Sequence, residues 1–432
     1  MRLSLLAALA VIAGFLPTQA IAQDLLITNA RMVDPGERLI TAGNLLVRDG
    51  RIAGFPEKRP AGFTGTVVDA QGRWVIPALT DMHTHSFGNS AATGPGEMLG
   101  PAGVAKVALR AGVARYLDLF SQEDFIFGVR NNQRAGNVPG AEIFAAGPCL
   151  TATSGHCSEY GVPTRIVDTP EDAEREVTAL AAKHPDVVKI VYDNATYSSR
   201  SMPTVNRATL EAVIAVAKEH GLKTVVHIGT WQDLRDAVEA GAAAVTHTPR
   251  GQMPDDLPAL MVAHGAFHIP TLGVQGDFAR YLEDPALLDS PLLAEVVRGD
   301  VIQSYRQAPD SGSRFAGWVA WQHSIISANL DAVSHLAKAG VLMLTGTDAG
   351  NPAVFQGYSV HRELRLLVEA GLSTWDALAA STTSPGRFFG RDWGLSVGSE
   401  ATLLVLDGSP IDDIRNTERI HTIIQRGAVV TP

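Results

Sequence analysis

The middle of the chain alternates short apolar runs with longer amphipathic stretches, and this alternation limits the fold more than any other feature. The helical stretches lie at residues 171–183, 208–220, 234–240 and 330–339, and several end in a glycine, as helix C-caps favour. Strand candidates fall at residues 113–118, 142–146, 187–191, 223–228, 243–247, 267–272 and 341–345. With the apolar run at Val75 they make eight βα units, which predict a closed parallel (β/α)8 TIM barrel of the α/β class.

Both ends of the chain are instead rich in strands. Runs at residues 25–33 and 44–48 are followed by an Asp49-Gly50 hairpin turn, and runs at 402–407 and 421–425 are followed by an Arg426-Gly427 turn. We expect one small β-sandwich domain built from residues 23–74 plus 394–432. The barrel would then occupy residues 75–393, with residues 273–316 inserted as a lid or substrate loop.

The first residues have the pattern of a signal peptide. Arg2 precedes an apolar run at residues 3–16, and Ala20-Ile21-Ala22 supplies small residues before a cleavage site. The run is shorter than the roughly 20 residues that span a bilayer. We predict that residues 1–22 are removed and that the protein is exported, to the periplasm or the medium. A buried N-terminal helix or an uncleaved anchor is the alternative.

Net charge limits the classes of molecule that the protein can bind, and the two cysteines limit its disulfides. The 432-residue chain has a net charge of −10, which gives no support to nucleic-acid binding, and it has no basic cluster for an anionic membrane. A small-molecule substrate is the expected partner, with no stable membrane insertion after signal removal, and a homo-oligomer is left open. The two cysteines, Cys149 and Cys157, form either a local disulfide or two free buried thiols.

Polar residues recur where the predicted strands end. A barrel gathers its active site at the C-terminal ends of its strands. Each residue taken singly has a simpler explanation: the lysine could lie at a solvated strand edge, the histidines in the core, and the aspartate at a turn or helix cap. Together they point to one site, which comprises His83 and His85 after the first strand, Lys189 in the fourth, His227 and His247 at the ends of the fifth and sixth, and Asp348 after the eighth.

This set resembles the amidohydrolase superfamily in its two-metal subtype with a carboxylated lysine, which includes imidazolonepropionase-like and prolidase-like hydrolases. The resemblance implies that carbon dioxide converts Lys189 to a carbamate that bridges two divalent metal ions, most simply zinc. His83, His85 and Asp348 would then hold one ion, and His227 and His247 the other. Independently of the family, imidazoles and carboxylates suit zinc, and two cations would stabilise a carbamate anion.

The expected function is that of an exported metal-dependent amidohydrolase. A hydroxide held between two ions near neutral pH would attack the amide carbonyl of a dipeptide, an N-acyl amino acid or a cyclic amide. Asp348 would pass the proton to the leaving amine. A lactonase or esterase on the same scaffold is an alternative, as is a deaminase, which Lys189 disfavours. A barrel that binds a small molecule without turnover is the alternative outside the enzymes.

Weaker candidates surround this set. His156 matches a Gly-His of several relatives and is a candidate donor to the substrate carbonyl, while Tyr192 and Arg250 are candidate substrate contacts. His361 and Glu363 are interpreted as scaffold. Two positions depart from the family. Gly229 stands where prolidase-like members commonly have tyrosine, which weakens a prolidase assignment, and Thr402 replaces a frequent aspartate away from the site.

Overall fold

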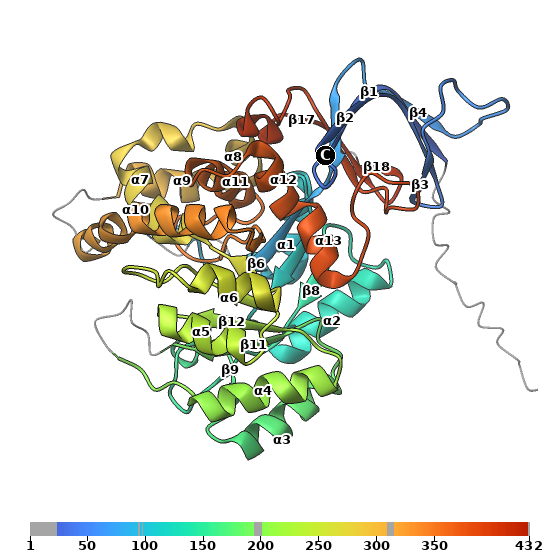
Figure 1. Ribbon diagram of the computed structural model, residues 1–432. Helices are drawn as coiled ribbons and strands as arrows, with labels where there is room; N and C mark the ends of the chain where they lie inside the picture. Colours follow the sequence, from blue (N-terminus) through green and yellow to red (C-terminus); the bar gives the residue numbers. More distant parts are fainter. Residues whose placement is uncertain (1–23, 94–95, 97, 194–200, 309–314, 431–432) are drawn as a thin grey trace, which may run out of the picture.

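The computed structural model describes residues 24–93, 96, 98–193, 201–308 and 315–430 (Figure 1). The predicted signal peptide, residues 1–22, lies outside them. Within the described part, none of the helices combines the length and apolarity needed to cross a membrane.

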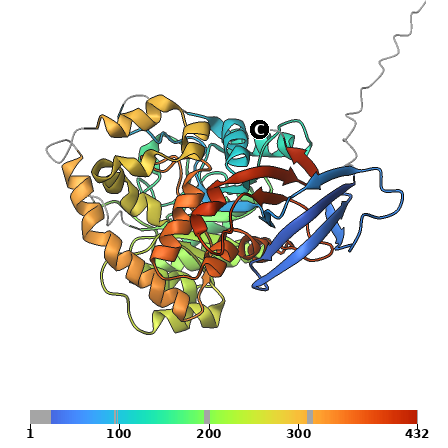
Figure 2. The ribbon, with the colours of Figure 1, turned by 90° about the horizontal axis from the view of Figure 1, so that it is seen from above.

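The two ends of the chain share one sheet of eight strands. The strands from both termini, blue and red in Figures 1 and 2, lie side by side. Asp49 and Gly50, with φ of 49° and 71°, make the left-handed hairpin turn that the sequence predicted. The order is β18-β17-β16-β5-β1-β2-β3 with β4 paired to β1, and the bounds are β1 (Leu25–Asp34), β2 (Leu39–Arg48), β3 (Arg51–Gly54), β4 (Thr66–Asp69), β5 (Trp74–Pro77), β16 (Leu403–Leu406), β17 (Ile420–Gln425) and β18 (Ala428–Val430).

The prediction that the strand at Val75 belongs to the barrel is wrong. Its strand, β5, pairs in parallel with β1 and antiparallel with β16, so it belongs to the terminal sheet. The first strand of the middle region is the next one, β6 (Leu79–Thr84). Apolar residues run through both strands without a turn signal, because both are buried on two faces. The sequence therefore did not show where one sheet stops and the other begins.

The middle of the chain forms two parallel sheets, as expected for an α/β protein. One has the order β6-β7-β8 and the other β10-β9-β11-β12-β13-β14-β15. Backbone hydrogen bonds join the two sheets, from Met82 on β6 to Thr345 after β15 (2.9 Å) and from Asp186 before β11 to Ala145 on β8 (2.9 Å). The bounds are β7 (Val113–Asp118), β8 (Glu142–Ala145), β9 (Leu150–Thr151), β10 (Arg165–Ile166), β11 (Val188–Tyr192), β12 (Thr224–Ile228), β13 (Ala244–Thr246), β14 (Phe267–Ile269) and β15 (Leu342–Met343).

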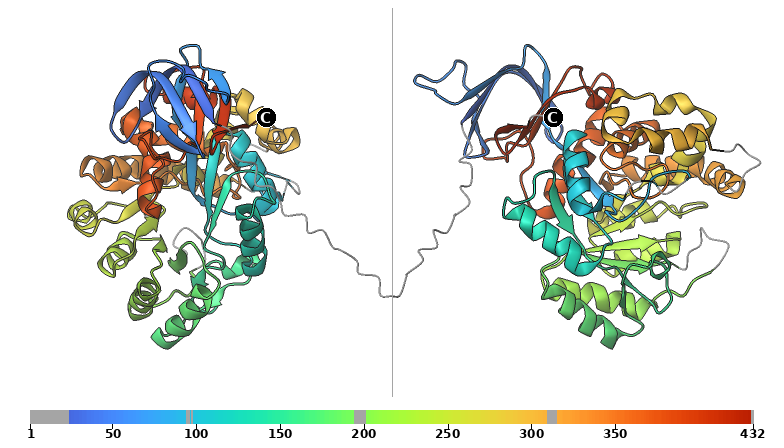
Figure 3. Two further views of the ribbon diagram at one scale, coloured as in Figure 1. Left: turned by 90° about the vertical axis from the view of Figure 1, so that its right-hand side faces the viewer. Right: turned by 180° about the vertical axis from the view of Figure 1, so that it is seen from behind.

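Helices cover the outside of these strands (Figure 3). Capping boxes start α3 at Thr169 and α5 at Thr230, and the left-handed glycines Gly221, Gly241 and Gly340 follow α4, α5 and α10. The predicted helices are all present. The bounds are α1 (Gly100–Arg110), α2 (Glu123–Arg134), α3 (Pro170–Ala181), α4 (Arg207–Glu219), α5 (Trp231–Glu239), α6 (Leu257–His264), α11 (Ser359–Glu369), α12 (Thr374–Ser381) and α13 (Thr383–Phe389).

The segment 273–316, expected as a loop, is mostly helical. It contains α7 (Leu272–Glu283), α8 (Pro291–Val296) and α9 (Gly299–Arg306), and it leads into the long α10 (Ala316–Lys338). An apolar cluster that includes Phe278 and Tyr305 holds these helices together. Pro285, Pro291 and Gly299 divide the segment with residues typical of turns, so it resembled a loop in the sequence.

Candidate active site

His83 and His85 form the first half of the site at the end of β6. Alternation along the strand puts both side chains on one side, and their Nε2 atoms lie 3.2 Å apart. Oδ1 of Asp348 approaches both, at 3.2 Å from His83 and 2.8 Å from His85. Two nitrogens bound to one tetrahedral zinc ion at ~2.0–2.1 Å would stand about 3.3 Å apart. The three ligand atoms therefore have the spacing of a single metal shell.

His227 and His247 form the second half. His227 lies on β12, and His247 directly follows β13. Nδ1 of His227 lies 3.0 Å from Nε2 of His247. The two halves adjoin, since one ligand atom each of His83, His247 and Asp348 lie within 4.8 Å of one another. His247 (φ 77°) and Asp348 (φ 61°) both have left-handed backbones, a strained conformation that recurs at active sites.

Lys189 lies between the two halves, inside the protein. Its side chain is 2% exposed, so the interpretation as a solvated strand edge is wrong. Nζ has no hydrogen-bond partner among the described residues. Burial lowers the pKa of Lys189 to about 8, which favours the neutral amine that a carbamate requires. An orphaned buried amine among the candidate metal ligands fits the bridging role that the resemblance implies for Lys189.

The electrostatics of the site keep its side chains in their ligand forms. Burial lowers the pKa of His83 to about 3, and it lowers the pKa values of His227 and His247 well below the ordinary histidine value. Burial alone would raise the pKa of Asp348, but the neighbouring His83 and His85 outweigh it and hold that pKa well below its usual range. Neutral imidazoles and an ionised carboxylate are the species that bind divalent metals.

Two threonines orient the histidines, and the sequence reasoning missed both. Thr246 Oγ1 lies 2.7 Å from Nδ1 of His83, and Thr271 Oγ1 lies 2.7 Å from Nδ1 of His247. A threonine oxygen that accepts the Nδ1 proton leaves Nε2 with its lone pair, which is the atom turned toward the site in both rings. Neither threonine stands out in the sequence, although Thr246 directly precedes His247.

Two buried aspartates support the site and were also missed. Asp81 accepts hydrogen bonds from the backbone of His83 and from the hydroxyl of Thr347, which ties β6 to the loop that carries Asp348. Asp193 is 1% exposed, and its Oδ2 lies 3.3 Å from Nε2 of His227. A signal for Asp81 exists, since it stands two residues before His83 on the same strand. Asp193 comes directly after β11, where a barrel places functional groups.

Of the three weaker candidates for substrate contact, two lie at the site and one does not. The ring of His156 lies 4.9 Å from that of His227, and its Nδ1 donates to Glu159 at 2.5 Å. Arg250 is exposed and lines the same cavity. The prediction for Tyr192 is wrong, because its hydroxyl donates to Asp236 on α5. Side chains alternate along β11, so Tyr192 faces the helices while Lys189 faces the interior.

The site opens into a cavity of about 520 Å³ with two apolar walls. Phe87, Phe120 and Tyr160 form one wall, with ring centroids 5.3–6.5 Å apart. The other wall comes from α7, α10 and the loop after β13, and includes Val274, Trp318, Trp321, Ile325 and Pro249. The indole Nε1 of Trp321 is buried without a hydrogen-bond partner among the described residues. Arg250 is the charged lining residue outside the candidate ligand set.

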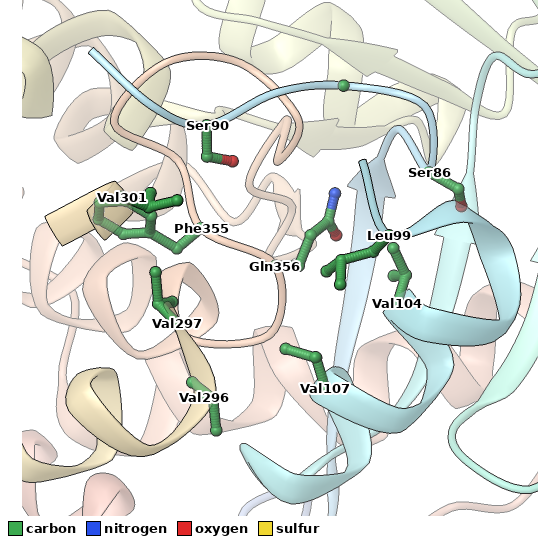
Figure 4. Close-up of a pocket in the computed structure, with 11 residues that line it drawn as sticks. Ser86, Ser90, Leu99, Val104, Val107, Val296, Val297, Val301, Phe355 and Gln356 are labelled. Atoms are coloured by element: carbon green, nitrogen blue, oxygen red, sulfur yellow. The ribbon is translucent and has the colours of Figure 1, made fainter. Parts of the chain in front are cut away.

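A second, smaller cavity lies beside the segment that follows β6 and is shown in Figure 4. Its volume is about 30 Å³, and its walls are mostly aliphatic, from Val104 and Val107 of α1 and Val296 of α8. Gln356 closes one side and donates to the backbone oxygen of His85. A space of this size is too small for a substrate.

His361 and Glu363 are scaffold, as predicted. His361 bonds to the hydroxyl of Thr417 and donates to the backbone oxygen of Ala111, and Glu363 accepts from the backbone of Leu272 and Gly273 at the start of α7. These contacts join α11 to neighbouring elements. Neither side chain lines the active-site cavity.

Comparison with known proteins identifies the family. Residues 74–430 match the model of the amidohydrolase family. The chain belongs to this family. The match spans both parallel sheets, the candidate metal ligands and the C-terminal strands, so this amidohydrolase is a hydrolase by family.

Relatives and solved structures share the fold at low identity. Ochratoxinase of Aspergillus niger is 21% identical over 383 residues, which cover 79% of this chain and 72% of that protein. Its crystal structure has a TM-score of 0.73 at 18% identity, covering 94% of this chain and 95% of that one. A Xaa-Pro dipeptidase with bound methionine in its active site has a TM-score of 0.76 at 19% identity, covering 95% of this chain and all (100%) of that one.

Proposed function

We propose that this amidohydrolase is an exported metal-dependent enzyme that hydrolyses an amide bond of a small molecule. The observation that carries the proposal is the convergence of four histidines, Asp348 and the orphaned amine of Lys189 at one end of a large cavity. The family match and the joined parallel sheets support a closed eight-stranded barrel, with the terminal sheet completing a β-sandwich domain.

The donor set fits two divalent ions. His83, His85 and Asp348 would hold one ion, His227 and His247 the other, and the carbamate of Lys189 would bridge them. Such ions supply a water-derived nucleophile near neutral pH and polarise a carbonyl. Zinc suits the nitrogen-rich ligand set.

The remaining steps belong to the chain itself. Asp348 is placed to accept a proton at Oδ1, since its carboxylate is ionised and directed at the site, and to pass the proton to the leaving amine. Glu159 fixes the ring of His156 through Nδ1, and the imidazolium form of this ring, paired with that carboxylate, is the proposed donor from Nε2 to the substrate carbonyl oxygen. Both roles use atoms that already line the cavity or the candidate metal shell.

The cavity favours an apolar substrate that carries a carboxylate. Aromatic side chains on both walls can hold a flat or bulky apolar group, which excludes water from the carbonyl. Arg250 supplies a donor for an anion or a carbonyl oxygen. Among the expected substrates, an N-acyl amino acid or a dipeptide with a large apolar side chain meets these conditions better than a small cyclic amide.

A hydrolysis screen tests this function. The mature protein, loaded with zinc in bicarbonate buffer, is assayed against N-acyl amino acids, dipeptides, lactones and cyclic amides, with the Asp348→Asn variant as the matched control. We expect release of an amine from an N-acyl amino acid or dipeptide, and no release by the variant. Turnover of lactones alone would replace the amidase assignment by a lactonase. A protein that binds zinc but hydrolyses no class would support the non-catalytic alternative.

Export is proposed from residues 1–22 alone. A fusion of residues 1–30 to a reporter that is active only outside the cytoplasm would be active if this segment directs export. N-terminal sequencing of the secreted product should begin at Gln23. Retention of the reporter in the cytoplasm would contradict this part of the proposal.

A further inference from the structure

The two cysteines form a thiol pair beside the active site. Cys149 and Cys157 are both free, at 0% and 5% exposure, and they pack together in one apolar cluster with Phe120 and Val191. Burial raises the pKa of the Cys149 thiol and the adjacent Cys157 thiol adds to the increase, so the two thiols are neighbours. Nothing in the proposed hydrolysis uses either thiol, so the pair requires its own explanation.

The two thiols differ in access and in anchorage. Cys157 lines the active-site cavity, whereas Cys149 does not. Cys149 directly precedes β9, and its backbone oxygen accepts from Arg165 at 3.0 Å. Cys157 lies in the loop after β9 and has φ of 88°, which is unfavourable for a residue with a side chain. Cys157 is therefore the accessible and movable member, and Cys149 the fixed one.

We propose that Cys149 and Cys157 are a redox modification site, oxidised to a disulfide by exchange with a small disulfide that enters the active-site cavity. In the first step the Cys157 sulfur attacks the disulfide, forms a mixed disulfide and releases one thiol. In the second step the Cys149 sulfur attacks Cys157 and releases the other thiol. Two protein thiols and one disulfide thus give one protein disulfide and two small thiols, and the two protons leave with the small thiols.

The new bond moves the loop that carries His156. A disulfide is about 2.05 Å long, shorter than any hydrogen-bonded contact between two sulfurs, so the sulfurs must approach. Since Cys149 is held by the sheet, Cys157 makes most of the movement. His156 is its immediate neighbour, with a ring 4.9 Å from His227. Oxidation therefore withdraws His156 from the carbonyl position and lowers turnover.

Mass spectrometry tests the site without reference to activity. The full mature protein is reduced, then incubated with glutathione disulfide, blocked with iodoacetamide and digested. We expect peptides linked through Cys149 and Cys157, and two free thiols again after dithiothreitol. Two alkylated cysteines after prolonged oxidation would overturn the proposal.

Single variants test the order of attack. Cys149→Ser should trap glutathione on Cys157, because the resolving thiol is missing. Cys157→Ser should remain unmodified, because Cys149 does not reach the cavity. Cys149→Ala repeats the first test with a residue that leaves no unpaired hydroxyl in the core, and thermal melts confirm that each variant folds. Equal labelling of the two single-cysteine proteins would contradict entry through the cavity.

The effect on turnover rests on the proposed function and is measured separately. Oxidised protein should show several-fold lower kcat than reduced protein, with dithiothreitol restoring it, whereas Cys157→Ser, which should remain unmodified, should give the same kcat with and without treatment by the oxidant. A disulfide that forms but leaves kcat unchanged would overturn the coupling to His156. Absence of any hydrolysis would count against the proposed function, while the mass measurement would still decide the modification site.

Discussion

A carboxylate oxygen of Asp193 lies 3.3 Å from Nε2 of His227, on the side of the ring opposite to His247. A carboxylate at that position favours the tautomer with a proton on Nε2 and a lone pair on Nδ1. The lone pair then faces His247, where the second ion is proposed to bind. Asp193 thus orients the candidate ligand His227, which lies 34 positions later in the sequence.

Asp193→Asn should weaken metal binding by on the order of 10–100-fold, as loss of a carboxylate behind a ligating histidine does in other metal sites. Competition with a chromophoric chelator measures the affinity, and Asp193→Glu should restore part of it. The exposed Asp255→Asn is the matched control. Equal zinc affinity in Asp193→Asn and the control would show that this carboxylate does not orient His227.

Lys189→Ala should abolish most metal binding and most hydrolysis, since the proposed bridge between the ions disappears. Atomic emission after gel filtration gives metal per chain, with Lys218→Ala, an exposed lysine on α4, as control. Infrared spectroscopy with ¹³C-bicarbonate should detect a carbamate in the parent protein and not in the variant. Full metal content and activity in Lys189→Ala would refute the bridging role.

Arg250→Met should reduce kcat/KM for substrates with a free carboxylate about 3–10-fold, the effect of one charge-assisted contact at an exposed position. The matched substrate is the same N-acyl amino acid with its carboxylate converted to an amide, which the variant should hydrolyse as well as the parent does. The expected loss should also shrink at high salt. A uniform loss on both substrates would assign Arg250 to loop structure.

The buried His361 should make folding stability depend on pH. Burial lowers the pKa of His361 from 6.5 to about 4, so the unfolded chain takes up a proton first as the pH falls. Its contribution is complete above pH 6.5 and decreases toward pH 4, by at most about 1.4 kcal/mol per pH unit. His361→Gln can still donate to Ala111, and its denaturation free energy should fall less steeply between pH 6.5 and 4.5. Parallel pH curves for both proteins would contradict this account.

Much of the fold followed from sequence because its signals are local. The periodic stretches before Gly221 and Gly241 contain their own start and stop residues, and the structure has helices there. The run around Val75 was misassigned since two buried strands in different sheets have the same apolar composition. The helices α7 to α9 were missed because Pro285, Pro291 and Gly299 divide the segment in the sequence, although packing around Phe278 holds the helices together.

The sequence predicted those site residues whose position on a strand is enough to place them. His83, His85, Lys189, His227, His247 and Asp348 come together as expected, because strand ends converge in this fold. The prediction for Tyr192 was wrong because Tyr192 stands three positions after Lys189 on the same strand. Its side chain therefore points to the opposite side, away from the site. Asp193 and Thr271 were missed because a supporting contact depends on distances between elements, which no single stretch of sequence encodes.

The sheet that joins both chain ends has a consequence for synthesis. Strand β5 pairs with β16, so Trp74 and Leu406 become neighbours only after nearly the whole chain has left the ribosome. Until then β5 exposes an unpaired edge that invites association with other chains. A chain that stops before Leu403 keeps every candidate metal ligand and still lacks the strand that covers this edge. Premature termination should therefore produce aggregates, and not a smaller soluble enzyme.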